Sequence, residues 1–394
     1  MRTAAAVLAI GLAYAGPALA NDSSAELAAG GLVFIQNPNV EMASEELFVS
    51  PPEIRVTYHF FNKSDQDVTN LVAFPMPDIT FASEDTNLAI PTADPQNFLG
   101  FSTKVNGKPV TAQIEQKVFA KGVDQTALLQ QLGIPLAPQS PATGAALDAL
   151  PKDKWQQLID LGLVEMVEYE DTPPPSPDNP GAPGMPGGSG MPPGTSGSDA
   201  GAAAGPGAAS GGPGADAGAA PAAPSGGVPP PSPGMKQHLD PRWTLKTTYF
   251  WQQTFPAHQE TIVEHRYQPS VGESVETLIG NPQFPDHPEY QKKYCMSPDF
   301  LAAASKAWQQ AAKTDSRQYA EERIDYVLST GANWAGPIGD FTLIVDKGDS
   351  NALVSFCATG VEQLSPTQYK LHLTNFTPPS DLAILILTKQ PIQY

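Results

Sequence analysis

The stretch from residue 247 to 272, TTYFWQQTFPAHQETIVEHRYQPSVG, constrains the fold of this chain more than any other. If residues 248–255 are extended, Tyr249, Trp251 and Phe255 lie on one face. Large apolar side chains on one face of an extended run are typical of a half-buried strand. The first part of the stretch therefore predicts a strand that buries aromatic rings.

The second part of the stretch has the same pattern. Val263, His265 and Tyr267 share one face of an extended run over residues 261–267. Between the two runs, residues 256–260 have the length of a hairpin loop. We therefore predict a central hairpin that closes the sheets of the first half of the chain and leads into the second half.

The first twenty residues have the pattern of a secretory signal peptide. Arg2 is followed by a short apolar run over residues 4–15, and Ala18-Leu19-Ala20 has the A-x-A form of a cleavage site. The mature chain is therefore expected to begin near Asn21. The apolar run is shorter than the roughly 20 residues that span a bilayer, and no later stretch is long enough. These features predict a periplasmic or secreted protein with no transmembrane segment.

The charge of the chain excludes two classes of partner. It has 41 acidic and 22 basic residues, with a formal net charge of -19. Nucleic acids and anionic membrane surfaces are bound by Lys and Arg patches, so neither is expected as a partner. This leaves an unknown protein or glycan partner in the cell envelope.

The two cysteines, Cys295 and Cys357, predict one disulfide, since an oxidising compartment favours pairing of an isolated pair. A redox-active or nucleophilic thiol is the alternative, although the chain has no C-x-x-C motif.

Other short patterns indicate further strands of a mainly β fold. Ile54, Val56, Tyr58 and Phe60 alternate with polar residues, as in a strand with one buried face. Glu45-Glu46 is interpreted as a turn. Asn106-Gly107 predicts a tight hairpin, because Asn and Gly accept the positive φ of a type I′ turn.

In the first half of the chain, FFNKSDQDVTNLVAFPMPD and GFSTKVNGKPVTAQIEQKVFAKG together resemble a vault/inter-alpha-trypsin (VIT) type of β-sandwich. The segment FPAHQETIVEHRY resembles a later strand pair of that family. The matching features are a strand end at Phe61, the turn Phe74-Pro75-Met76-Pro77, the hairpin Asn106-Gly107-Lys108 and the run over residues 117–120. VIT proteins often carry an adjacent metal-binding adhesion domain, whose D-x-S-x-S signature is absent here.

A second resemblance covers nearly all the chain outside its low-complexity segment. The stretches that carry it are GGLVFIQNPNVEMASEELFVS, VAFPMPD, YFWQQTFPAHQETIVEHRYQPSVG, NWAGPIGDFTLIVDKG and LVSFCATGV. In these stretches the chain is similar to domain-of-unknown-function family 4424, a family of exported bacterial proteins. Neither resemblance implies a function.

Residues 172–235 are rich in Pro, Gly, Ala and Ser and have few large apolar side chains. Such a segment cannot bury enough apolar surface to offset its ordering entropy, so we predict a disordered insert. It is either a tether or spacer, or an insertion tolerated in a surface loop, and predicted strands on both sides favour the insertion. Residues 21–171 and 236–272 would then form one discontinuous antiparallel β-sandwich domain.

Residues 273–394 are expected to form a smaller C-terminal domain, an antiparallel sheet with two helices. Ser297 and Pro298 are typical of the start of the first helix, and residues 316–328 are interpreted as the second. Four strands are expected, over residues 341–345, 353–357, 369–373 and 382–387. The predicted disulfide would fix the helices to this sheet.

The chain has no familiar catalytic, nucleotide-binding or metal-binding motif, and its six histidines are scattered. No catalytic, cofactor-binding or metal-ligating residue is therefore predicted. Trp251, His258, His265 and Trp334 are the candidates for a binding surface, although clustered aromatic residues are more often part of a core.

Three functions are compatible with these features. The first is a non-enzymatic exported protein used for binding or envelope association. The second is a hydrolase or metal-dependent enzyme with a site between the two domains. The third is a purely architectural or adhesive role with the insert as spacer.

Overall fold

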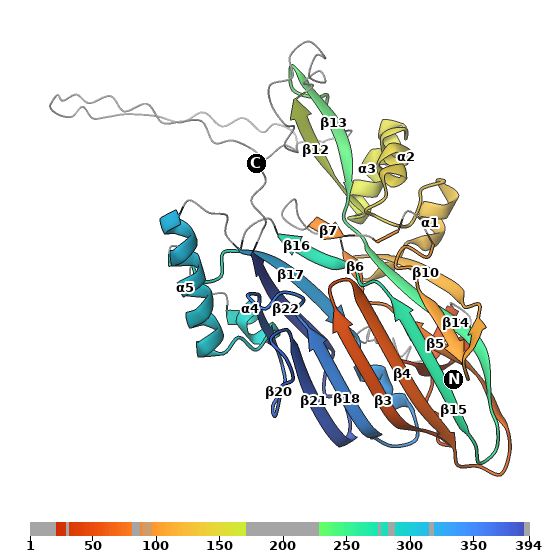
Figure 1. Ribbon diagram of the computed structural model, residues 1–394. Helices are drawn as coiled ribbons and strands as arrows, with labels where there is room; N and C mark the ends of the chain where they lie inside the picture. Colours follow the sequence, from red (N-terminus) through yellow and green to blue (C-terminus); the bar gives the residue numbers. More distant parts are fainter. Residues whose placement is uncertain are drawn as a thin grey trace, which may run out of the picture. The chain divides into compact units, whose positions relative to one another are not determined.

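The computed structural model describes residues 21–28, 31–80, 87–89, 91–92, 94, 96–170, 228–274, 277–282, 288–314 and 319–389 (Figure 1). The predicted signal peptide, residues 1–20, and most of the predicted insert, residues 172–235, lie outside the described residues. The chain divides into two units. One runs to Val167 and resumes at His238, and the other is Glu168–Gln237. The sheets and helices below belong to the first unit, except where β12 (Val164–Glu170) and β13 (Met235–Pro241), a two-stranded sheet, extend into the second.

Three larger sheets make up the described fold. The first sheet has the order β11 (Val123–Asp124), β10 (Gln113–Ala120), β14 (Thr244–Phe255), β5 (Val68–Pro75), β1 (Ser23–Ala28) and β2 (Gly31–Phe34), with β6 (Ile79–Thr80) paired to β14. The second sheet has the order β20 (Glu362–Gln363), β21 (Gln368–Phe376), β18 (Ile338–Asp346), β3 (Val40–Ser50), β4 (Glu53–Asn62), β15 (Glu260–Tyr267), β8 (Ser102–Val105) and β9 (Lys108–Val110). The third sheet has the order β19 (Leu353–Phe356), β22 (Leu382–Lys389), β17 (Tyr319–Tyr326), β16 (Val271–Ser274) and β7 (Asn87–Ala89). The predicted fold class, mainly β with a few helices, is confirmed.

The two central strands are present, but the predicted hairpin between them is wrong. β14 lies in the first sheet, between β10 and β5, whereas β15 lies in the second sheet, between β4 and β8. The Asn62 amide explains the crossing, since it donates to the Phe255 carbonyl oxygen at 2.8 Å. The Asn62 backbone accepts from the His258 N–H at 3.0 Å. These bonds hold the connecting loop against the end of β4, so the chain changes sheets instead of folding back.

Aromatic side chains fill the space between the first and second sheets. The ring centroids of Phe101 and Tyr249 are 4.2 Å apart, and those of Phe60 and Phe255 are 5.6 Å apart. Trp251 and His265 meet edge to face at 5.3 Å. The period-2 pattern therefore identifies the buried faces of both strands correctly, although it does not predict which strands pair.

The expected all-antiparallel pairing and the four-stranded C-terminal sheet are also corrected. β18 pairs parallel to β3, with Leu343 opposite Leu47, and β21 continues the second sheet beyond β18. β19 and β22 instead join the third sheet. Phe341, Leu343 and Val345 are buried, so β18 extends the apolar inner face of β3. Hydrogen bonds of the second sheet therefore cross the domain boundary that was expected at residue 272.

The short tight hairpin and one of the expected C-terminal helices are confirmed. Asn106 and Gly107 have φ of 49° and 74°, the two positive values that a type I′ turn needs. The Ser297 hydroxyl accepts a hydrogen bond from the Phe300 N–H at 3.1 Å, as expected for the N-cap residue of α5. The described helices are α1 (Thr126–Gln131), α2 (Pro141–Asp148), α3 (Lys152–Leu161), α4 (Pro288–Lys293), α5 (Pro298–Thr314) and the 3-10 turn η1 (Ser329–Asn333).

The helix expected over residues 316–328 is wrong, because residues 319–326 form β17. Ile324 and Tyr326 are fully buried and Asp325 between them is exposed, which is the alternation of a strand. Pairing with β22 along its whole length therefore decides the conformation.

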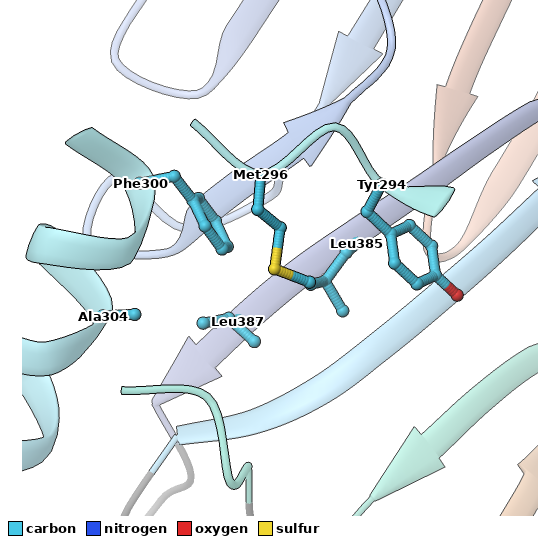
Figure 2. Close-up of a cluster of buried hydrophobic side chains, with 6 residues drawn as sticks. All are labelled: Tyr294, Met296, Phe300, Ala304, Leu385 and Leu387. Carbon is cyan, nitrogen blue, oxygen red and sulfur yellow. The ribbon is translucent and has the colours of Figure 1, made fainter. Parts of the chain in front are cut away.

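An apolar cluster lies where α5 covers the third sheet. Figure 2 shows Phe300 and Ala304 on α5 turned toward Leu385 and Leu387 of β22, with Met296 and Tyr294 beside them. The expected disulfide joins Cys295, just before α5, to Cys357, just after β19. The bond fixes the start of α5 to the third sheet, whereas the second helix that the prediction attached there is the strand β17. No helix in the described part of the chain is long and apolar enough to cross a membrane.

Candidate functional site

A group of polar side chains lies buried where strands of all three sheets meet. We call it the inner polar cluster. Its members are Asn21 and Asp22 before β1, Glu45 of β3, Tyr58 of β4, His265 of β15, Tyr326 of β17 and Thr330 of η1. Residues far apart in the sequence therefore meet at the first described residues of the chain.

Asp22 and His265 form a wholly buried pair. The Asp22 Oδ1 and His265 Nε2 atoms are 2.9 Å apart, and neither side chain has any exposed surface. The Trp334 indole N–H donates to the Asp22 carbonyl oxygen at 2.6 Å. The other carboxylate oxygen of Asp22 and the other ring nitrogen of His265 have no hydrogen-bond partner in the described residues.

Asn21 is bonded through both its side chain and its backbone. Its amide donates to Glu45 Oε2 at 2.9 Å, and its amide oxygen accepts from the Tyr58 hydroxyl. Its backbone N–H donates to the Thr330 hydroxyl, which donates in turn to the Asn21 carbonyl oxygen at 2.6 Å. The Tyr58 and Tyr326 hydroxyls are 3.0 Å apart. Asn21 thus connects the second sheet to β17 and η1.

Burial sets the protonation of this cluster. It raises the pKa of Glu45 to about 8; the Asn21 bond opposes this and the Asp22 charge adds to it. Burial also raises the pKa of Asp22, although His265 opposes the rise. The pKa values of Tyr58 and Tyr326 rise well above their usual value for the same main reason. Glu45 is therefore a carboxyl group that stays protonated in the fold at neutral pH.

The cluster is closed to substrates in this arrangement. A general acid or base must come within hydrogen-bond reach of its substrate, and the Asp22 and His265 side chains have no exposed surface. Among the described residues, no three His, Cys, Asp or Glu side chains are grouped as metal ligands would be. The arrangement can connect strands of the three sheets through hydrogen bonds, and it places ionisable side chains inside the fold.

The structure places three of the four predicted binding-surface residues around this cluster. Trp251, His265 and Trp334 are each at most 3% exposed, and all three touch Asp22 or one another. His258 instead lies in the exposed loop after β14, with φ of 53° and Nε2 2.7 Å from Asp65 Oδ1. Whether any of the four binds a partner remains a prediction.

Sequence reasoning missed Asn21, Asp22 and Glu45. Glu45 was interpreted as part of a turn, but it lies inside β3. A β-bulge between Met42 and Ser44 shifts the alternation by one residue and turns Glu45 inward. Gly339 of β18 lies against the bulge, since a Cβ there would be 2.5 Å from the Ala43 carbonyl oxygen. The only signal in the sequence was the two acidic residues breaking an otherwise regular strand.

A second feature is a polar hollow of about 470 Å³ at the surface of the first unit. It lies beside β10, between this strand and α1. Uncharged side chains line it: Gln96, Ala112, Gln113, Ile114, Gln116, Gln130 and Leu136. Its volume falls within the range of small-ligand pockets, about 300–1,000 Å³.

The hollow runs along an edge of the first sheet. Within the described part of the chain, the strand pairing on the side of β10 away from β14 joins Phe119 and Ala120 to β11. The Val118 N–H donates to the Thr126 hydroxyl at 2.9 Å and its carbonyl accepts from the Gln125 N–H at 2.9 Å, so its backbone groups point away from β14. Outward-pointing backbone groups alternate along an antiparallel strand, so the backbone of Ile114 also points to this side.

Sequence comparison places the chain in a family. Residues 20–181 and 219–385 match the family described as "Domain of unknown function (DUF4424)". The chain belongs to this family. The matched ranges contain every residue of the inner polar cluster of this DUF4424 protein and the residues that line the hollow.

No curated protein matches the sequence of this DUF4424 member. Among solved structures, it is similar to one described as "a putative nutrient binding protein" from Legionella pneumophila subsp. pneumophila str. Philadelphia 1. The sequence identity is 14% and the TM-score 0.38, and the match covers 94% of this chain and 70% of that one.

Proposed function

We propose that this DUF4424 protein is an exported, non-enzymatic binding protein that takes an extended, uncharged peptide segment of an envelope partner in the hollow beside β10. The observation that carries the proposal is the hollow itself, because it lies along a strand edge. An extended peptide can add to such an edge through backbone hydrogen bonds. The amides of Gln113 and Gln130 in the hollow offer further donors and acceptors.

Two further features support export. The disulfide between Cys295 and Cys357 is typical of proteins outside the reducing cytosol. The A-x-A sequence before Asn21 predicts removal of a signal peptide. Together they support a periplasmic or secreted location for this proposed binding protein.

The packing of the first half of the chain supports its proposed relationship to VIT-type β-sandwiches. The first and second sheets contact each other through aromatic side chains such as Phe60 and Phe255. Such packing is typical of β-sandwiches and supports the proposed VIT-like character of this half.

The test is a selection from a randomised peptide display library on the exported, oxidised protein. Peptides retained by the natural sequence are measured against two variants of α1. Gln130→Trp places a large ring in the hollow, whereas Gln131→Trp makes the same change on the exposed neighbouring residue that does not line it. We expect Gln130→Trp to weaken binding at least tenfold and Gln131→Trp to leave it unchanged.

A strand-edge variant tests the mode of binding. Ile114→Pro removes a backbone N–H that points toward the hollow, and proline is tolerated on a sheet edge. We expect loss of peptide binding with little change in the midpoint of unfolding. Equal retention of peptides by Gln130→Trp and Gln131→Trp, or no retained peptide at all, would contradict the proposal.

A further inference from the structure

The predicted first residue of the mature chain occupies the middle of the inner polar cluster. Asn21 has no exposed surface, and the next three residues, Asp22, Ser23 and Ser24, are equally buried. Chain termini are usually exposed, so a terminus at this position needs an explanation. The family match begins at residue 20, next to Asn21.

The backbone nitrogen of Asn21 lies close to buried carboxyl groups. The side-chain amide of the same residue is 2.9 Å from Glu45 Oε2. The covalent geometry of asparagine then places the backbone nitrogen within about 8 Å of this carboxyl group. Glu45 Oε1 and Asp22 Oδ2 are buried acceptors without a hydrogen-bond partner in the described residues.

The cluster contains more acidic than basic side chains. Its two carboxyl groups, of Asp22 and Glu45, face one ring that can carry a positive charge, that of His265. No Lys or Arg side chain is among the hydrogen-bond partners of either carboxyl group in the described residues. While the Asn21 nitrogen is part of a peptide bond, Glu45 is protonated and Asp22 is paired with His265, so a further buried cation would let Glu45 ionise and pair with it.

Signal-peptide removal would supply that cation. Hydrolysis adds one water across the peptide bond between Ala20 and Asn21. Ala20 leaves with a new carboxylate, and the nitrogen of Asn21 becomes an amine that takes up a proton. The resulting ammonium group has three donors where the peptide nitrogen had one. One can keep the bond to the Thr330 hydroxyl, which leaves two donors for nearby acceptors such as the unpartnered Oε1 of Glu45.

We propose that the mature amino terminus of Asn21 is a buried ammonium group that pairs with Glu45, so that removal of the signal peptide completes the core of this fold. The proposal rests on the predicted export of the chain and is independent of peptide binding in the hollow. It assigns a structural role to the processing site and explains why polar residues at the start of the chain lie at the junction of three sheets.

The test is a double-mutant cycle on the exported protein. Its first residue is established by intact mass, with Asn21 expected. One variant carries a two-residue Gly-Ser extension before Asn21, a second carries Glu45→Gln, and a third carries both. We expect the extension to lower Tm by about 3–6 °C in the natural sequence. With Glu45→Gln the extension should lower it by less than half as much, because the pair is already absent.

A matched control and a direct chemical measurement separate pairing from simple crowding. Glu46→Gln makes the same change on the neighbouring exposed residue. In that variant the extension should lower Tm as much as it does in the natural sequence. Acetylation of the α-amine, followed by mass spectrometry on the unmutated protein, should be at least tenfold slower in the folded than in the urea-unfolded chain. The proposal is overturned if the exported chain starts elsewhere, if folded and unfolded amines react equally fast, or if the extension costs the same with and without Glu45.

Discussion

The inner polar cluster and the apolar cluster beneath α5 are both buried, but they are stabilised by different physics. The apolar cluster joins α5 to β22 through side chains such as Phe300 and Leu385 (Figure 2). The disulfide-bonded Cys295 lies between two of its residues, Tyr294 and Met296. The inner polar cluster joins three sheets through hydrogen bonds and buried charge. Apolar packing tolerates small changes of shape, whereas a buried charge that loses its partner has no substitute. The comparison predicts that the polar cluster is the more sensitive of the two.

The largest expected effect comes from breaking the buried pair. His265→Ala leaves the Asp22 carboxylate without its partner in a site with no exposure, and we expect a loss of about 3–5 kcal/mol in the free energy of unfolding. The measurement is urea unfolding at constant pH.

His258→Ala is the matched control for that variant. His258 and Asp65 are also paired, at 2.7 Å, but their side chains are 58% and 91% exposed. An exposed pair contributes about 0–1 kcal/mol, so this variant should unfold close to the natural sequence. Similar losses in the two variants would show that burial is not what makes the Asp22–His265 pair important.

The second-largest expected effect comes from removing the disulfide beside the apolar cluster. Cys295 and Cys357 are 62 residues apart, and a crosslink closing such a loop is expected to stabilise the fold by about 4 kcal/mol on the chain-entropy account. Replacing both cysteines with alanine should lower the midpoint of thermal unfolding accordingly. Dithiothreitol should lower the midpoint of the natural protein and leave that of the double variant unchanged; an equal response of both proteins would contradict the stabilising role.

The two regions also differ in how much of them could be predicted from sequence. The disulfide and the start of α5 follow from local signals, a lone cysteine pair and a Ser-Pro sequence, and both are present. The burial of Trp251 and Tyr58 follows from the two-residue period of their strands. Each of these signals lies within a few residues of the feature it predicts.

The two-residue period indicates the buried faces that carry Tyr58 and His265, but no local signal predicts that they meet the other members of the inner polar cluster. Its members come from the start of the chain, β3, β4, β15, β17 and η1, and they meet only because β18 pairs in parallel with β3 and β14 crosses to a different sheet from β15. Periodicity gives the buried face of a strand but not its partner. The burial of Glu45 could not be predicted from periodicity either, because a bulge reverses the alternation of β3. Long-range pairing is therefore the information that sequence patterns lacked.

The smallest expected effect is a dependence of stability on pH. It should arise from the inner polar cluster, since the six residues of the apolar cluster include no Asp or Glu. In a chain where the Asn21 nitrogen is blocked, the pKa of Glu45 is about 8 in the fold against an ordinary 4.5. The folded state then holds more protons than the unfolded state between these values. The contribution of Glu45 to stability is therefore fully present below pH 4.5 and is lost as pH rises toward 8. The pKa of Asp22 is raised as well and acts in the same direction.

We expect the blocked chain, extended before Asn21, to lose on the order of 3 kcal/mol in the free energy of unfolding between pH 5 and pH 8. The other titratable groups that face Glu45 and Asp22 are Tyr58, Tyr326 and His265, and the two tyrosines stay neutral throughout this range. Glu45→Gln should flatten most of the decline, whereas Glu46→Gln should not. A chain that begins with a free amine at Asn21 should decline less, because the ammonium group lowers the pKa of Glu45. An equally steep decline with Glu45→Gln would assign the pH dependence to a different group and remove Glu45 from the centre of the cluster.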